Sequence, residues 1–286
     1  MESKGSFVAV GLGMMLGAHL SPRSRSEIEH ADAVFVLVSD AVVELWLEHI
    51  RPDMRSLQPY YAEGKRRTDS YREMIEAMLS EVRVGRRVCG VFYGHPGVFA
   101  QVPHHAVEQA RAEGFEAEMQ PGISAEDCLY ADLGIDPATY GCQHYEASQL
   151  LFYRRRLDPS AYLVIWQIGL TGDRTLARYS TGPAYRRLLV DRLIEAGYPP
   201  DHEVVVYEAA TLPIAVPRID RMPLSALIQA DLRLQSTLAV PPAQPMVRDE
   251  AMLARIAAID AAPNSTSVAA DGESRRRLVP NLPQVE

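Results

Sequence analysis

The residues of this chain best suited to chemistry are a group of tyrosines with one arginine among them. Tyr61, Arg67, Tyr71 and Tyr93 supply phenol hydroxyls that exchange protons and a guanidinium that holds an oxyanion through paired hydrogen bonds. Arg67 and Tyr71 are four residues apart, so they share a helix face if the helix expected over residues 70–84 begins early. Arg67 would then lower the pKa of a neighbouring tyrosine. The alternative is a surface cation packed on tyrosine rings.

Tyr93 also opens a glycine- and proline-rich loop. The loop, Tyr93-Gly94-His95-Pro96-Gly97, follows the apolar run Val88 to Phe92. The carboxyl end of a strand in an α/β sheet is where ligands bind. Glycines allow close backbone approach, and proline fixes one φ angle. We therefore expect a functional loop here, with a plain tight turn as the alternative.

A second group of glycines, Gly11, Gly13 and Gly17, follows the apolar run Phe7 to Val10. The spacing of these glycines departs from the dinucleotide fingerprint G-x-G-x-x-G. Asp40 is the only acidic residue near the end of the second expected strand that could bind a ribose. On this pattern alone, the support for nucleotide binding is weak.

Three segments in the C-terminal part place polar side chains near expected strand ends. They are Tyr145-Glu146-Ala147-Ser148, Trp166-Gln167 and Tyr207-Glu208-Ala209. Each fits the lining of a cleft or an ordinary strand cap. The eight histidines show no H-E-x-x-H or comparable spacing, and the chain has no G-x-S-x-G elbow. We therefore expect neither a metal site nor a serine hydrolase.

Short apolar runs alternate with helical patterns, which is typical of an α/β fold with a mainly parallel open sheet and helices on both faces. Strands are expected over residues 7–10, 33–38, 88–92, 115–119, 162–167, 204–207 and 237–240. Helices are expected over residues 25–31, 70–84, 104–113 and 183–196, with a short amphipathic helix over residues 252–259. Ser124 and Asp127 predict a further helix start, with Ser124 as its N-cap.

The domain organisation follows from a hinge at Pro121-Gly122-Ile123. We expect an N-terminal α/β half over residues 1–120, a C-terminal α/β half over residues 121–245, and a short helix with a flexible tail over residues 246–286. A chain of 286 residues that is 47% hydrophobic is long enough to build a core in each half.

Composition excludes several classes of protein. The formal net charge of -8, without a dominant basic face, does not suit nucleic-acid binding. Cys89, Cys128 and Cys142 show no CxxC spacing and cannot all pair, so we expect no disulfide framework. No apolar stretch reaches the length of a membrane span, and no secretory signal is visible at the N-terminus. A cytoplasmic location is expected.

These motifs in their order along the chain resemble a known class. Gly11-x-Gly13, the Tyr93 loop, Pro121-Gly122-Ile123-Ser124-Ala125 and Trp166-Gln167 are similar to the tetrapyrrole-methylase class (class III) of S-adenosylmethionine-dependent methyltransferases. Within that class, four longer motifs resemble the borosin peptide backbone α-N-methyltransferases: residues 60–71, residues 91–99, residues 124–129 and residues 145–148. The resemblance covers residues 5–260. The bulky Met14-Met15-Leu16 departs from a typical nucleotide cradle.

The resemblance implies a fold of two αβα halves with the cofactor cleft between them. The implied cofactor is S-adenosyl-L-methionine, and its product is S-adenosyl-L-homocysteine. Arg67, Tyr71 and Tyr93 match the family's catalytic group, and Tyr61 matches a supporting tyrosine. The positions that match cofactor contacts are Tyr93, His95, Val98, Phe99, Ser124, Ala125, Gln167, Tyr207, Ala209, Ser236 and Thr237.

The implied reaction is methylation of backbone amide nitrogens in a ribosomally made precursor peptide. An amide N–H is a very weak acid, so the nitrogen becomes nucleophilic only as its proton leaves and charge moves onto the carbonyl oxygen. Arg67 suits the stabilisation of that imidate oxygen, and Tyr71 or Tyr93 suits the removal of the proton.

The resemblance also implies partners. Fused members of the family append a helical clasp and an apolar core peptide, whereas only about 25 residues follow the last expected helix here. We therefore expect the split arrangement, in which a separate precursor peptide binds a homodimer, with a heterotetramer containing two precursors as a further possibility. The alternatives are a methyltransferase for a tetrapyrrole or other small molecule, self-methylation of the C-terminal tail, and an inactive cofactor- or peptide-binding module.

Overall fold

The computed structural model of the chain describes residues 4–38, 40–62 and 64–262. It divides into two compact units, Met1–Pro245 and Met246–Glu286. Within the first unit, the part up to residue 120 is called the N-terminal half below, and residues 121–245 are called the C-terminal half. The expected tail lies, from residue 263 onward, outside the described residues.

The N-terminal half is built around a parallel sheet of five strands in the order β3-β2-β4-β1-β5. The strands are β1 (Ser6–Gly11), β2 (Ala33–Leu37), β3 (Arg55–Ser56), β4 (Arg87–Phe92) and β5 (Glu116–Met119). β1 lies between β4 and β5, while the chain leaves β1 toward β2 and leaves β4 toward β5. The connections of β1 and β4 therefore run in opposite directions, on opposite faces of the sheet, and this pair of strands is the topological switch point where α/β sheets bind ligands.

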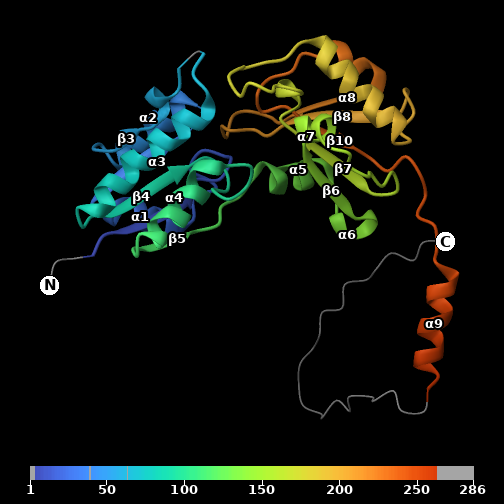
Figure 1. The fold of residues 1–286 in the computed structure, drawn as a ribbon, viewed down its shortest axis with the longest axis horizontal. Coiled ribbons are helices and arrows are strands. Elements are labelled where there is room, and N and C mark those ends of the chain that lie inside the picture. Colours follow the sequence, from blue (N-terminus) through green and yellow to red (C-terminus); the bar gives the residue numbers. More distant parts are fainter. Residues whose placement is uncertain (1–3, 39, 63, 263–286) are drawn as a thin grey trace. The chain divides into compact units, whose positions relative to one another are not determined.

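Helices cover both faces of this sheet, as expected (Figure 1). α3 (Arg67–Arg83) and α4 (Gln101–Ala112) pack on the face that includes Phe7, while α1 (Pro22–His30) and α2 (Ala41–Ile50) pack on the face that includes Val10. Neighbouring strand residues point to opposite faces, so both sets of side chains are buried, which explains the unbroken apolar runs in the sequence.

The C-terminal half contains a second five-stranded sheet, which is mixed rather than parallel. Its order is β6-β7-β10-β8-β9, with β6 (Cys142–Glu146), β7 (Tyr162–Trp166), β8 (Glu203–Glu208), β9 (Arg218–Pro223) and β10 (Thr237–Val240). Only β6 and β7 are parallel, and β10 runs antiparallel to both β7 and β8. The expectation of a mainly parallel sheet is thus wrong for this half. Packing on both faces makes its antiparallel strands as apolar as parallel ones, so composition did not distinguish the two.

Helices again lie on both faces of this sheet (Figure 1). α7 (Ala147–Phe152) and α8 (Pro183–Glu195) contribute to one core cluster, and α5 (Ala125–Leu133) contributes to the other. α6 (Pro137–Tyr140) and three short 3-10 turns complete the unit, at Gln58–Tyr60, Ile168–Leu170 and Leu224–Gln229. The expected capping box is confirmed, because Ser124 and Asp127 exchange side-chain and backbone hydrogen bonds at the start of α5.

The second unit contains α9 (Glu250–Asp260), whose N-cap is Asp249. Met252, Leu253, Ile256 and Ile259 lie on one side of this helix, as the periodicity predicts. Across the described ranges of the whole chain, no helix combines the length and the apolar character that crossing a membrane requires.

Candidate functional site

The loops after β1 and β4 meet at the switch point of the first sheet. Gly13 and Gly94 form an isolated antiparallel bridge, in which the amide of Gly13 donates to the carbonyl of Gly94 (3.1 Å) and the amide of Gly94 donates to that of Gly13 (2.9 Å). These bonds fix the loop that carries Tyr93 to the glycine loop that ends β1. The two glycine motifs of the sequence thus belong to one structure.

Close packing explains the glycine at position 11. A Cβ atom there would lie 2.3 Å from the carbonyl oxygen of Gly94, and a Cβ atom at position 122 would lie 2.6 Å from the same oxygen. Real Cβ atoms do not approach this closely, so the backbone segments at residues 11, 94 and 122 meet only because they lack side chains. The departure of Gly11, Gly13 and Gly17 from the dinucleotide fingerprint is consistent with this packing role.

The predicted tyrosines and Arg67 come together beside this loop. α3 begins at Arg67, three residues before the expected start, so Arg67 and Tyr71 do share a helix face. The rings of Tyr61 and Tyr71 meet edge to face with centroids 6.3 Å apart. Tyr61 is also close enough to Tyr93 and Arg67 for both to influence its ionisation. One arginine and three phenols from three separate segments therefore form a single cluster.

The electrostatics of the cluster correct one expectation. Burial raises the pKa of Tyr61, the hydroxyls of Tyr71 and Tyr93 raise it further, and the opposing effect of Arg67 is too small to reverse this. The pKa of Tyr93 is raised as well, by burial of its hydroxyl and by Tyr71, although the residue as a whole remains 53% exposed. The expectation that Arg67 lowers the pKa of a neighbouring tyrosine is therefore wrong for Tyr93, because desolvation of its phenol dominates.

Arg67 is held by a loop of the C-terminal half. Its Nη2 donates to the carbonyl of Arg178 at 2.8 Å and lies 3.9 Å from Oδ2 of Asp173, while its backbone amide donates to the carbonyl of Leu176 at 3.1 Å. None of the cation–π contacts found among the described residues involves Arg67. The simple stacking alternative therefore does not describe it.

The anchoring loop was not predicted from the sequence. Leu176 has a φ of 55°, which is uncommon for a bulky residue. Oδ1 of Asp173 accepts from the amide (2.9 Å) and the hydroxyl (2.6 Å) of Thr175, and its Oδ2 accepts from the amide of Arg178 (3.2 Å). Burial alone would raise the pKa of Asp173, but these bonds and Arg67 lower it below its usual value. The Asp173-x-Thr175 turn was the one local signal that could have indicated this loop.

The remaining predicted residues of the first half lie in the loop after β4. Nδ1 of His95 accepts from the amide of Gly97 at 2.8 Å, and the amide of Val98 donates to the carbonyl of His95 at 3.1 Å. Phe99 has a φ of 51°, and its ring centroid is 5.3 Å from that of Trp166 at the end of β7. This ring contact brings the loop after β4 to the edge of the second sheet.

A second edge collects the predicted residues of the C-terminal half. Gln167 follows β7, Ala209 follows β8, and Thr237 begins β10, which pairs antiparallel with both strands. Gln167, Ser236, Thr237, Tyr207 and Ala209 therefore lie at the same end of the sheet. Gln167 has a φ of 58°, in the left-handed region, so its backbone is held in a costly conformation at this edge. Ser124 and Ala125, at the first turn of α5, belong to the same half.

Two of these side chains face the protein interior. The hydroxyl of Tyr207 donates to Asp132 at 2.7 Å, and burial together with this carboxylate raises the pKa of Tyr207. The hydroxyl of Ser236 donates to Glu208 at 2.6 Å. The hydroxyls are thus used internally. The backbone of Ser236 is paired as well, since its amide donates to the carbonyl of Arg233 (3.1 Å) and its carbonyl accepts from the amide of Ile168 (3.2 Å).

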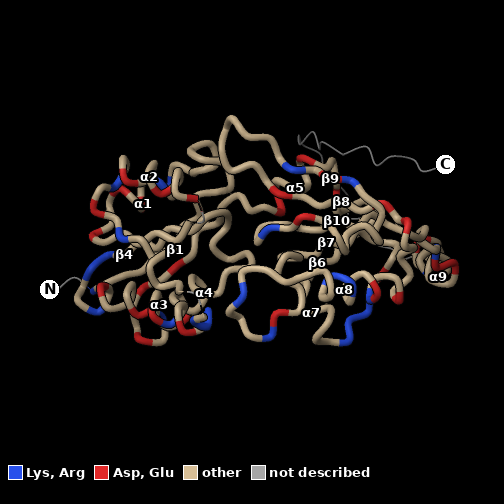
Figure 2. Tube along the Cα trace, turned by 90° about the horizontal axis from the view of Figure 1, so that it is seen from above, with Lys and Arg blue, Asp and Glu red and all other residues tan. Residues whose placement is uncertain are grey.

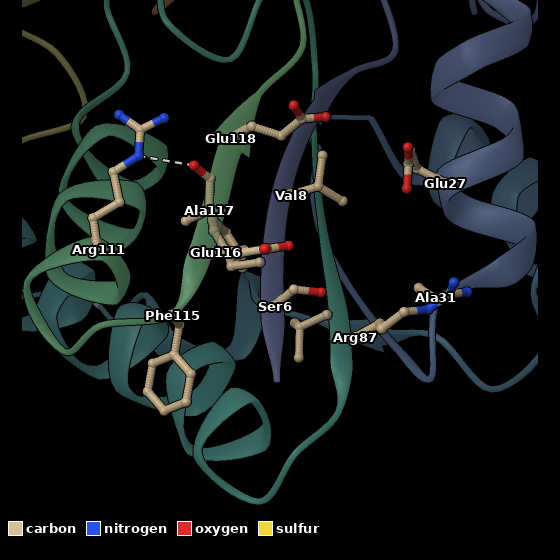
Figure 3. Close-up of a pocket in the computed structure, with 12 residues that line it drawn as sticks. Ser6, Val8, Glu27, Ala31, Arg87, Arg111, Phe115, Glu116, Ala117 and Glu118 are labelled. Carbon is tan, nitrogen blue, oxygen red and sulfur yellow. Dashed lines mark hydrogen bonds between the residues drawn. The ribbon is translucent and has the colours of Figure 1, made fainter. Parts of the chain in front are cut away.

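A shallow cavity of about 560 Å³ lies elsewhere on the N-terminal half (Figure 3). Ser6, Arg87 and Glu116, which begin β1, β4 and β5, are among its lining residues. It therefore lies toward the amino ends of these strands and contains none of the predicted site residues. Because parallel sheets bind ligands at the opposite end, we assign the functional site to the carboxyl edge instead.

The described residues include no group of three or more His, Cys, Asp or Glu side chains placed to hold a metal ion.

Comparison with known proteins identifies the family. Residues 6–222 match the tetrapyrrole (corrin/porphyrin) methylases. The chain belongs to this family.

Solved structures of tetrapyrrole methylases share the fold. Uroporphyrin-III C-methyltransferase from Thermus thermophilus superposes with a TM-score of 0.59 at 19% identity, covering 84% of this chain and 93% of that one. A cobalt precorrin-4 methyltransferase gives a TM-score of 0.60 at 17% identity, covering 82% and 94%. The predicted class III methyltransferase fold is thus confirmed.

The curated relatives of this tetrapyrrole methylase are named as methyltransferases joined to peptide precursors, not as enzymes of tetrapyrroles. A methyltransferase/ribosomally synthesized type I borosin cyclic peptide precursor from Coprinopsis marcescibilis is 41% identical over 251 residues, which are 85% of this chain and 64% of that protein. A methyltransferase/ribosomally synthesized gymnopeptides precursor from Gymnopus fusipes is 42% identical over 247 residues, which are 84% and 58%. This chain thus spans less than two thirds of the length of these relatives.

Proposed function

We propose that this chain is an S-adenosyl-L-methionine-dependent methyltransferase that methylates backbone amide nitrogens of a ribosomally made precursor peptide, several along one chain. The observation that carries the proposal is the cluster of Arg67 with Tyr61, Tyr71 and Tyr93 at the carboxyl edge of the first sheet. The similarity to proteins named as borosin methyltransferases and precursors supports the peptide substrate.

The residues of the two edges suit the cofactor. The Gly11–Gly94–Gly122 contact brings backbone to the switch point, Phe99 offers an aromatic face, and Ala125 and Ala209 leave room by their small size. Gln167, directly after β7, and Thr237, at the start of β10, line the other edge. When bound, the cofactor would supply an activated methyl group on its sulfonium, so that the N–C bond would form as the S–C bond breaks and S-adenosyl-L-homocysteine leaves.

In this mechanism, Arg67 donates hydrogen bonds to the carbonyl oxygen of the target amide and stabilises the charge that develops there. Tyr71 or Tyr93 accepts the amide proton, and Tyr61 supports them. The first 120 residues carry this group, and residues 121–245 complete the cofactor edge and hold Arg67 through the carbonyl of Arg178. We further propose that the enzyme is a homodimer and that its precursor is a separate peptide, so a loaded complex would contain two of each.

Co-expression of the chain with a small open reading frame encoded next to it tests the proposal. Intact mass spectrometry should show whole-methyl increments on the peptide, and fragmentation should place them on backbone nitrogens. Increments on the chain itself would indicate self-methylation instead. No increments on either, with S-adenosyl-L-homocysteine still bound, would favour a small-molecule substrate or an inactive binder.

The role of Arg67 is tested in the same assay. Arg67→Ala should abolish the increments while calorimetry still detects binding of S-adenosyl-L-homocysteine. Arg72→Ala is the matched control, because Arg72 lies on the same helix with its side chain 76% exposed and pairs only locally with Asp69. Unchanged turnover in Arg67→Ala would remove Arg67 from the mechanism.

A further inference from the structure

A continuous chain of hydrogen bonds crosses the C-terminal half without including any residue of the proposed site. Nε1 of Trp166 lies 3.2 Å from Nδ1 of His144, Nε2 of His144 lies 2.8 Å from the hydroxyl of Tyr130, and that hydroxyl lies 3.0 Å from Oε1 of Glu126. Glu126 and Tyr130 are on α5, His144 is in the middle of β6, and Trp166 ends β7. Three elements are thereby joined side chain to side chain.

The chemistry of the four groups fixes the direction of this chain. An indole N–H can only donate, so Nδ1 of His144 must present its lone pair to Trp166. A neutral imidazole then carries its proton on Nε2 and donates it to the oxygen of Tyr130, which in turn donates to Glu126. All donors and acceptors are matched only with His144 neutral and in the Nε2–H tautomer.

The surroundings of His144 favour this state. Burial lowers its pKa, and the carboxylate of Glu126, 3.6 Å from Nε2, opposes the shift without reversing it. Tyr130 remains a donor because burial, Cys142 and Glu126 all raise its pKa. The titratable groups facing this network are thus Glu126 and Tyr130 from α5 and Cys142 from β6. The imidazole also stacks on the Trp166 ring, with an angle of 18° between the planes.

Trp166 connects the network to the cofactor edge. Gln167 follows it directly with a φ of 58°, and the ring of Phe99, itself at a φ of 51°, lies 5.3 Å from the Trp166 ring. Glu126 lies just after Ser124 and Ala125 in the first turn of α5. One end of the network, Trp166, thus lies beside Gln167 and Phe99, and the other end, Glu126, lies beside Ala125; the proposed function assigns all three positions to the cofactor.

We propose that His144 is a positioning residue for the cofactor edge, and that as neutral imidazole it fixes Trp166 and thereby holds Gln167 and Phe99 in place for S-adenosyl-L-methionine. This role rests on the proposed function, because it presupposes the cofactor. A second proton would go onto Nδ1, where it would face the indole N–H, and two donors cannot bond to each other. Acidification should therefore release Trp166.

Binding of S-adenosyl-L-homocysteine, measured by calorimetry on the full chain, tests this without requiring turnover. The wild-type affinity should fall about fivefold to tenfold as the pH is lowered from about 7.5 to about 4.5, since one net hydrogen bond is lost. The fall should begin only below the unperturbed His pKa of about 6.5, because burial lowers the pKa of His144. His144→Asn keeps an acceptor for Trp166 but does not titrate, so its affinity should change less than about twofold over the same range.

Two further variants sharpen the comparison. Trp166→Phe removes the donor, so its affinity should be as low as that of the acidified wild type at every pH, without pH dependence. His202→Asn is the matched control. His202 is a partly buried histidine of the same half, lies directly before β8, and contacts the carbonyl of Pro241 through Nε2. It should retain the wild-type profile.

A second measurement does not depend on the ligand. Nitrogen-15 NMR of the imidazoles should show His144 in the Nε2–H tautomer at neutral pH. An Nδ1–H tautomer, or a wild-type pH dependence that persists in His144→Asn, would overturn the proposal. Wild-type binding that does not vary with pH would overturn the role of His144 alone. Absence of any binding by the wild type at about pH 7.5, well above the unperturbed His pKa, would overturn the proposed function and this role with it.

Discussion

At the scale of residues, the site combines a cation with phenols that are reluctant to ionise. Burial raises the pKa of both Tyr61 and Tyr93, so these phenols are protonated at neutral pH. A base that takes a proton from an amide must be a tyrosinate for part of the time. The raised pKa makes that form rare, and it also makes the tyrosinate a strong base once it has formed.

This leads to a pH dependence of the chemical step. Since the tyrosinate fraction grows with pH as long as the pH is below the pKa, the single-turnover methylation rate should rise by up to about tenfold per pH unit from about pH 7 to about pH 9.5. Rapid-quench measurements with mass-spectrometric detection would follow it. Tyr71→Phe and Tyr93→Phe identify the base, because the variant that lacks it should be slow with a flat profile. A wild-type rate that does not vary with pH would exclude a tyrosine base.

Residue types and spacing allowed the cluster to be predicted in part. The four-residue spacing of Arg67 and Tyr71 is a local feature and was sufficient to place them on one helix face. The sign of the effect on Tyr93 could not be predicted, because desolvation depends on which segments pack around a hydroxyl. The network around His144 was missed for the same reason, since its members come from α5, β6 and β7.

At the scale of elements, the loop from Gly172 to Thr181 has the clearest link to the proposed mechanism. It reaches Arg67 from a position 111 residues away along the chain, by the carbonyl of Arg178. Asp173 is almost fully buried and organises the loop by accepting hydrogen bonds from Thr175 and Arg178. The loop thus acts as a support for the guanidinium that the proposed mechanism requires.

Asp173→Asn tests this support. The amide would place a donor where Oδ2 now accepts from Arg178 and faces Arg67, so we expect a loss of about 1–3 kcal/mol in the free energy of unfolding. The methylation rate should fall, while the affinity for S-adenosyl-L-homocysteine stays within about twofold. Denaturant titration and calorimetry would measure the two effects.

Asp158→Asn is the matched control for that variant. Asp158 caps the amide (2.9 Å) and hydroxyl (2.7 Å) of Ser160 in the same geometry. In the described part of the chain, no hydrogen bond or ion pair joins Asp158 to Arg67, so the methylation rate of Asp158→Asn should remain that of the wild type. Equal losses of rate in both variants would argue against a special role for Asp173. The lowered pKa of Asp173 adds stability that is present above about pH 4, near the unfolded-state value, and is lost as the pH falls through the folded-state pKa.

The elements were predicted unevenly for physical reasons. Runs such as Val88 to Phe92 and the capping box at Ser124 carry strong local signals, and both are confirmed. β9 was missed because its residues alternate between partly buried and exposed at a sheet edge, so no apolar run marks it. Strand direction in the C-terminal half depends on connections between distant segments, and no periodicity encodes it.

At the scale of the whole molecule, the net charge of -8 is distributed unevenly. Figure 2 shows acidic and basic segments interspersed on the helices of the N-terminal half, and basic segments gathered near α7 and α8. Many charged side chains of the N-terminal half are paired. An example is the bidentate contact of Arg83 on α3 with Glu113 at the end of α4. Such exposed pairs add little stability, so the two halves depend mainly on their apolar cores.

The proposed homodimer makes a prediction about α9. Taken by itself, this helix carries Met252, Leu253, Ile256 and Ile259 on one side, and such a stripe requires an apolar partner surface. If that partner is a second copy of the chain, Ile256→Asp should shift the mass in solution from dimer toward monomer, because a buried carboxylate without a partner is costly. Sedimentation analysis over a range of concentrations would measure the shift.

Ala254→Asp is the control, since residue 254 lies on the opposite side of the same helix and the change introduces the same charge. It should leave the dimer intact. A wild-type chain that sediments as a monomer would contradict the homodimer itself. A dimer that persists in Ile256→Asp, with a lowered melting temperature, would instead show that α9 packs within its own chain and that the dimer forms through another surface.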